Sequence, residues 1–273
     1  GVVDLGTQSM FLSAADDRFD GNIRGQGDVI VLDGTQTLGG VNDFIGHASV
    51  RAGAALVLAD AGSIAAAASL TVDGVFDIAD TDAGARIRTV SGSGSILLGD
   101  QRLTVYDARG TFTGTIAGGN GGLTVAGGRL ELTGLASYRG RTFINAGANL
   151  VLSGTAAIPD SGVTVDGTLD VTAIGGTRLG GLAGAATGRV NLGNGTLTLT
   201  NANDSFAGII AGPGGLTVAR GTQTLTGVNT YTGATVISTG ARLRLSGAGD
   251  ITGTSGVTAD GTLDITTATQ DLT

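Results

Sequence analysis

The chain has 273 residues with a formal net charge of −8, contains no Cys, and owes all 15 basic residues to Arg. The acidic balance argues against binding to nucleic acids or anionic membrane surfaces, and the absence of Cys excludes disulfides and thiolate chemistry. Gly contributes 51 residues and Pro only 2, which excludes collagen, while a hydrophobic content of 41% is sufficient for a continuous core. No stretch is long and apolar enough for a membrane-spanning helix, and the first ten residues lack a signal-peptide pattern.

Short segments of alternating apolar and polar residues, separated by Gly, Asn and Asp-Gly, follow one another along the chain. A strand–turn–strand pattern recurs along the chain. It is clear over 121–152 and 214–245, and a more divergent copy spans 27–58. Apolar pairs mark the starts of successive strands at Leu123/Val125, Leu150/Leu152, Leu169/Val171, Val190/Leu192 and Leu216/Val218. Alternation with a period of two between turn residues predicts strands, and helix signals are nearly absent.

A longer repeat organises these strands. Phe19, Phe112 and Phe206 begin the same short pattern and are separated by 93 and 94 residues. The sequence therefore predicts repeat units over approximately 1–26 (partial), 27–119, 120–213 and 214–273 (partial), within a single segment covering 1–273. Because the chain starts and stops at different phases of the repeat, we expect it to be an interior piece of a longer array.

The repeat predicts an all-β fold. The apolar pairs recur at uneven intervals, and their mean spacing suits one coil of a parallel β-helix with three short strands and three corners. We expect a right-handed parallel β-helix (solenoid) of about 12 coils, with four coils of roughly 23 residues in each unit of about 93 residues. Leu, Val and Ile should point inward, and Gly and Asn should occupy the corners.

The segment 214–245 resembles the autotransporter-associated β-strand repeat. The matching positions are Gly214, Gly215, Leu216, Thr217, Val218, Leu225, Thr226, Gly227, Asn229, Tyr231, Gly233, Thr235, Val236, Gly240, Leu243 and Leu245. This motif covers about a third of the chain and occurs in passenger domains of type V autotransporters of Gram-negative bacteria. It identifies a class of proteins and not an activity.

The resemblance implies a secreted or cell-surface passenger segment on the outer side of the outer membrane. A signal peptide and a C-terminal translocator barrel would lie in flanking sequence. The implied role is that of a non-catalytic adhesin or stalk in cell adhesion or aggregation, whose partner is a host surface or matrix protein, a glycan or a second copy of the chain. Two alternatives remain open: a repeat element that promotes secretion and folding of the passenger, and a polysaccharide-active β-helix enzyme.

We expect no catalytic residues, cofactor site or metal site. His47 is the only His, no nucleophile motif surrounds it, and we interpret it as a turn or surface residue. The carboxylates of a glycan-cleaving enzyme would have to converge. Three pairs could resemble such a site: Asp73/Asp77, Asp166/Asp170 and Asp260/Asp264. Each pair lies four coils from the next, and the first Asp of each pair is followed by Gly, which is the dipeptide expected at a corner. We therefore interpret these Asp residues as turn residues.

Other residue groups have structural interpretations. Acidic clusters lie at Asp16, Asp17 and Asp20 and at Asp80 and Asp82, where solvated loop charge is the default and a surface Ca²⁺ the alternative. Phe44, Tyr138 and Tyr231 share one repeat position and should be core residues. Thr196/Thr198/Thr200 and Thr222/Thr224/Thr226 could form the ladder of an ice-binding surface only if every coil carried them. Arg139/Arg141 and Arg242/Arg244 should form a solvated face. Ligand contact is expected at the least repetitive loops, 80–95 and 172–189.

Overall fold

The protein is a right-handed parallel β-helix, as the sequence predicts. A computed structural model describes residues 1–158 and 161–269. The described chain contains strands and no helix, and the strands pair in parallel through about 13 turns, called coils below. This number is close to the expected dozen. It is slightly larger because each coil is somewhat shorter than expected: Val2 pairs with Asn22, and Val75 with Ser95.

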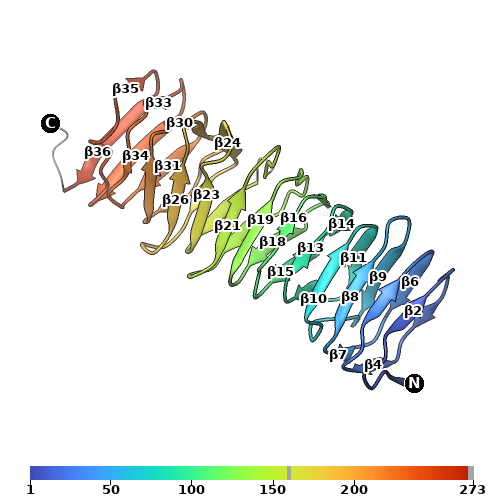
Figure 1. Cartoon of the computed structure of the whole chain (residues 1–273). Coiled ribbons are helices and arrows are strands. Elements are labelled where there is room, and N and C mark those ends of the chain that lie inside the picture. The colour runs from blue at the N-terminus through green and yellow to red at the C-terminus, as the bar shows by residue number, and fades with distance from the viewer. Residues whose placement is uncertain (159–160, 270–273) are drawn as a thin grey trace. The chain divides into compact units, whose positions relative to one another are not determined.

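The coils form two compact units, Gly1–Gly140 and Arg141–Thr273. Residues 159–160 and 270–273, which include the end of the last partial repeat, lie outside the described residues. In both units, strands that lie side by side in Figure 1 come from successive coils of the chain.

In the first unit, the first nine strands enter three sheets in rotation. The first sheet joins β1 (Val2–Asp4), β4 (Asn22–Gly25) and β7 (Asp43–Phe44). The second joins β2 (Met10–Leu12), β5 (Val29–Val31), β8 (His47–Val50), β10 (Ser69–Val72) and β13 (Val90–Ser91). The third joins β3 (Arg18–Phe19), β6 (Thr35–Leu38), β9 (Ala55–Asp60), β11 (Val75–Thr81), β14 (Ser95–Leu97) and β17 (Thr115–Ala117). Later coils of this unit add β12 (Ala85–Ile87), β15 (Arg102–Val105) and β18 (Gly122–Val125), and the pair β16 (Thr111–Phe112) and β19 (Arg129–Leu132).

The second unit continues the same three-strand coil. One sheet joins β20 (Thr142–Ile144), β22 (Val163–Val165) and β25 (Leu182–Ala183). Another joins β21 (Asn149–Leu152), β23 (Thr168–Val171), β26 (Arg189–Leu192), β29 (Ile209–Gly212) and β32 (Thr230–Tyr231). A third joins β24 (Gly176–Leu179), β27 (Thr196–Leu199), β30 (Leu216–Val218), β33 (Thr235–Ile237) and β35 (Val257–Ala259). The last joins β28 (Ser205–Phe206), β31 (Thr222–Leu225), β34 (Arg242–Gly247) and β36 (Thr262–Ala268).

Most strands bury alternate side chains inside their coil. In β27, Leu197 and Leu199 are fully buried, whereas Thr196 and Thr198 point outward. Full burial of such a side chain stabilises the fold by about 1.5–3 kcal/mol. The backbone groups of one coil are bonded by the coils before and after it, so the core and the hydrogen-bond ladder extend together. The side faces and corners are left for contact with other molecules.

One corner position requires glycine in every repeat. Gly34, Gly128 and Gly221 have φ angles of 77°, 74° and 77°, which L-residues rarely adopt. A Cβ at these positions would lie only 2.0, 2.1 and 1.9 Å from a carbonyl oxygen of the preceding coil. Gly240 has a similar φ of 78° but no atom within 4 Å of a Cβ. The position shared by Gly34, Gly128 and Gly221 is therefore restricted both by its backbone conformation and by the short distance between coils.

The sequence repeat is not a whole number of coils. Because coil partners are spaced as Val2 and Asn22 are, one repeat of the sequence spans close to four and two-thirds coils. Equivalent strands consequently lie on different sides of the solenoid. In the first unit, β2 belongs to the second sheet, but its equivalent β15 pairs with β12 and β18. In the second unit, β20 pairs with β22, but its equivalent β33 lies in the sheet of β24 and β27.

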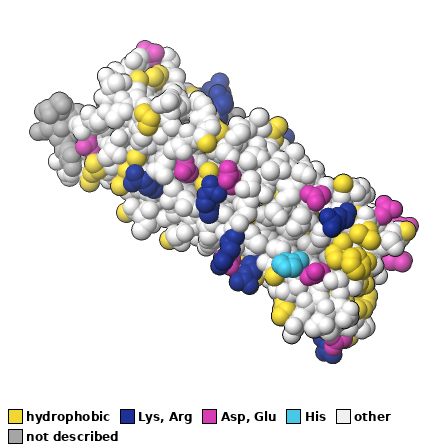
Figure 2. Space-filling model, in the orientation of Figure 1, with side chains coloured by type: hydrophobic (Ala, Val, Ile, Leu, Met, Phe, Trp, Pro, Cys, Tyr) yellow, Lys and Arg dark blue, Asp and Glu magenta, His cyan; other side chains and the backbone are white. Residues whose placement is uncertain are grey.

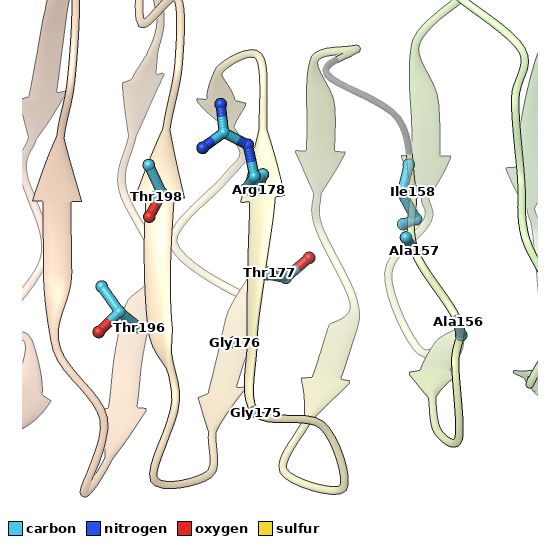
Figure 3. A pocket seen from close by; sticks show the side chains of 9 residues that line it. All are labelled: Ala156, Ala157, Ile158, Gly175, Gly176, Thr177, Arg178, Thr196 and Thr198. Carbon is cyan, nitrogen blue, oxygen red and sulfur yellow. The ribbon is translucent and has the colours of Figure 1, made fainter.

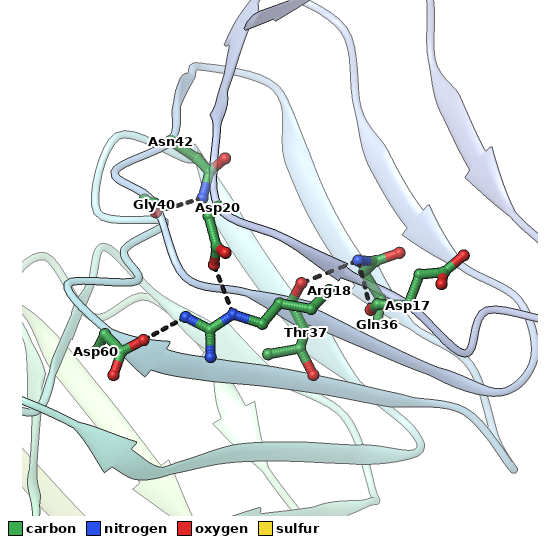
Figure 4. Close-up of polar contacts among 8 residues, drawn as sticks. All are labelled: Asp17, Arg18, Asp20, Gln36, Thr37, Gly40, Asn42 and Asp60. Atoms are coloured by element: carbon green, nitrogen blue, oxygen red, sulfur yellow. Dashed lines mark hydrogen bonds and ion pairs between the residues drawn. The ribbon is translucent and has the colours of Figure 1, made fainter. Parts of the chain in front are cut away.

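A buried asparagine connects three successive coils at one repeat position. The Oδ1 atom of Asn42 accepts the Ile23 N–H at 3.0 Å, and its Nδ2 donates to the oxygens of Gly40 and Ser63 at 2.9 and 3.0 Å. The contact with Gly40 is visible in Figure 4. The middle repeat has Ala136 here.

Asn229 repeats this arrangement in the second unit. Its Oδ1 accepts the Ile210 N–H at 3.0 Å, and its Nδ2 donates to Gly227 O at 2.9 Å and Asp250 O at 3.0 Å. The side chain is 2% exposed. Both asparagines therefore supply hydrogen bonds that the backbone ladder lacks at this corner.

A buried glutamine recurs with the asparagines. Gln36 donates from Nε2 to Asp17 O at 3.0 Å and to Thr37 O at 2.9 Å (Figure 4). Gln223 donates from Nε2 to Leu182 O at 2.9 Å and to Thr224 O at 3.1 Å. The middle repeat has a buried leucine at this position, so the amide is one of two solutions for the same inward site.

Candidate functional site

The side faces carry shallow depressions at the loops where the sequence predicted ligand contact. Asp82, Gly84 and Arg86, from the loop 80–95, line a hollow of about 340 Å³. Residues 175–178 and 180–181, from the loop 172–189, line two further hollows. Both loops of least repetitive sequence thus contribute residues to hollows of the surface.

The largest of these hollows, about 560 Å³, is lined mainly by small residues and threonines. Figure 3 shows Thr196 and Thr198 on one strand, Thr177 and Arg178 on the next, and Ala157 on the far side. Among the described residues that line it there is no carboxylate and no His. It can offer hydroxyl groups and one guanidinium group to a ligand, but among these lining residues there is no acid–base pair.

A smaller hollow of about 220 Å³ lies where strands of the second unit begin, and it is mainly polar. Arg141 donates from Nη2 to both carboxylate oxygens of Asp204, at 3.1 and 2.9 Å, and from Nη1 to Thr164 Oγ1 at 3.1 Å. The pair is mostly buried, with side-chain exposures of 32% and 21%. The sequence prediction that Arg141 belongs to a solvated face is therefore wrong: a partner 63 residues away, which no local pattern reveals, binds it.

Glycines make room for this ion pair. A Cβ at Gly162 would lie 2.6 Å from Arg141 Nη2, and a Cβ at Gly181 would lie 2.4 Å from Asp204 Oδ2. Arg141, Gly162, Gly181 and Asp204 each immediately precede a strand, so the pair lies along one corner of the solenoid. Any larger side chain at either glycine would have to displace it.

Two of the residues that line the hollow beside the loop 80–95, Asp60 and Arg86, make contacts that involve a cation. Arg18 forms ion pairs with Asp20, at 2.6 Å, and with Asp60 (Figure 4). Arg86 lies 5.5 Å from the centroid of the Tyr106 ring, and the Tyr106 hydroxyl donates to a backbone oxygen two coils away at 2.8 Å. These contacts connect coils along the side face, which is a stabilising role.

His47 lies on the surface, as predicted, at the start of β8. Its Nδ1 is 2.7 Å from Ser69 Oγ on the next coil, and its backbone N–H donates to Asp28 Oδ1 at 2.7 Å. A hydrolytic triad needs the carboxylate on the second ring nitrogen to orient the imidazole. Here Asp28 accepts a hydrogen bond from the backbone N–H of His47 and not from its ring. The three residues are therefore neighbours but lack the carboxylate–imidazole contact of a triad. The sequence alone did not identify Ser69 as a partner, because the pairing depends on coil register.

The prediction that the paired Asp residues are turn residues holds for the first Asp of each pair and is wrong for the second. Asp73, Asp166 and Asp260 lie at bends, whereas Asp77, Asp170 and Asp264 lie within β11, β23 and β36. Asp170 Oδ1 accepts the N–H and hydroxyl of Thr172, at 3.0 and 2.7 Å. Asp166 Oδ1 accepts the Ala185 N–H of the next coil at 2.8 Å. In the last repeat, the hydroxyl and N–H of Thr266, followed by Arg242 and Arg244, hold the pKa of the Asp264 carboxyl below its ordinary value.

The predicted core position is confirmed, and it also contains a hydrogen bond. Phe44, Tyr138 and Tyr231 are all buried. The Tyr231 hydroxyl is 2.6 Å from Thr235 Oγ1, and burial raises the pKa of Tyr231 to about 12. Four residues after each aromatic the sequence has Ala48, Thr142 and Thr235, so a buried hydroxyl accompanies Tyr but not Phe.

The remaining sequence predictions concern exposed groups. Thr198 pairs with Arg178 on one side and Thr217 on the other, and the row then reaches Val236, so no continuous threonine ladder forms there. Arg242 pairs with Asp264 at 3.2 Å, which joins this half-exposed Arg to the next coil. No cluster of three or more potential metal ligands occurs within residues 1–158 and 161–269. Nor does that part of the chain contain a helix suited to crossing a membrane.

Comparisons with known proteins give no relative. No family model matches the chain, and no curated protein or solved structure is significantly similar to it.

Proposed function

We propose that the chain is a passenger-type β-helix of a Gram-negative autotransporter that acts at the cell surface without catalysis, as an adhesin or stalk. The observation that carries this proposal is the stacking of parallel strands around an apolar core within each compact unit. Such a fold resists bending, and its side faces are polar with shallow hollows. It suits presentation of a surface over a distance better than enclosure of a substrate.

The repeat over 214–245 supports the class. The absence of Cys is compatible with either an oxidising or a reducing compartment. The partner would be a host surface or matrix protein, a glycan, or a second copy of the chain. Arg and acidic side chains are scattered over the face drawn in Figure 2, so contacts made there would include ion pairs and would be salt-dependent.

The test is adhesion by the folded chain. Beads coated with the purified protein should bind extracellular matrix or host cells, or aggregate with one another, whereas beads coated with heat-unfolded protein should not. Failure of all three would reduce the proposal to a stalk. Cleavage of a polysaccharide that is abolished by one Asp→Asn substitution would overturn the non-catalytic assignment.

A role in secretion is the second candidate. Each coil pairs in parallel with the coil before it, so a folded coil offers a template edge to the coil that follows. Folding that proceeds in this way outside the cell would draw the chain outward. Deletion of residues 121–213, which joins equivalent repeat positions, should then lower surface display per cell. Unchanged display with lost adhesion would favour the adhesin role instead.

A further inference from the structure

The polar hollow beside Arg141 has the features of a small, specific binding site for an uncharged ligand. The guanidinium and the carboxylate neutralise one another, so neither an anion nor a cation finds an unpaired charge there. The lining is mainly polar, which disfavours an apolar ligand. The glycines at its base leave room for the ion pair itself, which holds the Asp204 carboxylate in the lining of the hollow.

Two asparagines on the rim have unused hydrogen-bonding capacity. Asn201 and Asn203 are exposed, line the hollow, and have no side-chain hydrogen bond to any residue that the structure describes. Each amide offers one acceptor and two donors. Asp204 also lines the hollow, and its carboxylate oxygens can accept further bonds because an ionised carboxylate has about four lone-pair sites.

We propose that this hollow, formed by Arg141, Gly162, Gly181, Asn201, Asn203 and Asp204, binds one neutral sugar residue. A sugar ring carries neighbouring hydroxyls that each donate and accept. One hydroxyl can donate to Asp204 or an amide oxygen while its neighbour accepts from an amide N–H. The volume of about 220 Å³ accommodates a single ring and not an oligosaccharide.

The site would bind weakly and gain strength by repetition. No aromatic ring lines it, so the stacking that strengthens sugar sites is absent from this lining. We therefore expect a Kd of about 1–10 mM for a monosaccharide, and tighter binding only when many chains meet a surface rich in the sugar. This inference rests on the proposed function, because it names a glycan as the surface that the adhesin meets.

Saturation-transfer NMR on the full chain tests the site. The probes are neutral hexoses, deoxyhexoses and N-acetylhexosamines, with glucuronic acid, N-acetylneuraminic acid and triglycine for comparison. We expect saturation of at least one neutral sugar and none of the acidic sugars or the peptide. Asn203→Ala combined with Asn201→Ala should weaken binding about tenfold, since two hydrogen-bonding groups are lost.

Matched variants separate binding from folding. Asn194→Ala removes an exposed Asn of the same unit that does not line the hollow, and it should leave binding unchanged. Asp204→Asn keeps the shape but removes the carboxylate, and it should weaken binding while circular dichroism reports whether the coils remain folded. Absence of binding by every neutral sugar, preference for an acidic sugar or triglycine, or undiminished binding by the double variant would overturn the proposal. If beads adhere but no sugar binds, this inference fails and the proposed function stands. If sugar binds but beads do not adhere, this inference stands and the adhesin role fails.

Discussion

Replacement of Asn229 by Ala tests how side chains substitute for the backbone ladder at a corner. The substitution removes the acceptor of the Ile210 N–H and two donors to buried carbonyl oxygens. The carbonyls of Gly227 and Asp250 keep backbone donors, because Asp250 and Asn229 donate their own N–H groups to them. The main cost is therefore the unpaired Ile210 N–H.

The free-energy cost follows from these contacts. A buried donor left without a partner costs about 1–3 kcal/mol, and each lost amide–carbonyl bond contributes about 0.5–1.5 kcal/mol. Because the two carbonyls remain partly satisfied, we expect Asn229→Ala to lower the free energy of unfolding by about 2–4 kcal/mol. The middle repeat shows the one arrangement that could reduce this cost: beside Ala136, the Ile116 N–H donates directly to Leu135 O at 3.1 Å.

Urea denaturation followed by circular dichroism measures the change, and amide hydrogen exchange locates it. Exchange at Ile210 should accelerate by about 30-fold or more, since 1.4 kcal/mol corresponds to a factor of ten. The exposed control Asn194→Ala should change the unfolding free energy by less than about 0.5 kcal/mol. A loss below about 0.5 kcal/mol for Asn229→Ala, with unchanged exchange at Ile210, would refute the assigned role, because relaxation to the Ala136 arrangement would then be free of cost.

Three further predictions address the corners and the core. Gly221→Ala should destabilise the fold by at least about 2 kcal/mol more than Gly240→Ala, since both carry the same φ strain but only the first meets a carbonyl oxygen; equal melting curves would contradict this. Ala14→Gly should stabilise by about 0.5–1 kcal/mol in chemical denaturation, because Ala14 has a φ of 53°. The raised pKa of Tyr231, about 12 against an ordinary 10.0, means that the unfolded chain loses its proton first. The contribution of Tyr231 to stability should therefore be constant well below pH 10 and fall by roughly 2–3 kcal/mol as pH rises to about 12, and Tyr231→Phe should lack this part of the fall.

The fold could be predicted from the sequence because its determinants are local and repeated. Alternation at pairs such as Leu216 and Val218, with Gly at the corners, defines a strand and its inward face. Repetition supplies the rest, since a coil that cannot bury its own apolar face must be covered by similar coils. The period of the coil was harder to predict, because the intervals between apolar pairs are uneven and do not identify which side a strand joins.

Contacts along the solenoid axis could not be predicted in the same way. The pairs Arg141–Asp204 and His47–Ser69 join residues that are adjacent only because coils of unequal length bring them into register. The hydroxyl pair Tyr231–Thr235 was within reach of sequence analysis, since its loss in one repeat coincides with Ala48. That signal lies in the comparison of repeats with one another and not in any single motif.

The non-integral repeat limits how such a protein can change by duplication. Adding one whole repeat unit lengthens the solenoid but orients the new copy a third of a revolution away from the previous one. When a unit is copied, a residue that improves binding is copied with it. The copied residue faces another side of the solenoid, so it can contact only a second molecule that approaches from that side. Growth by whole units distributes a favourable contact around the axis and does not widen a single contact area, which suits capture of many separate partners at a crowded surface.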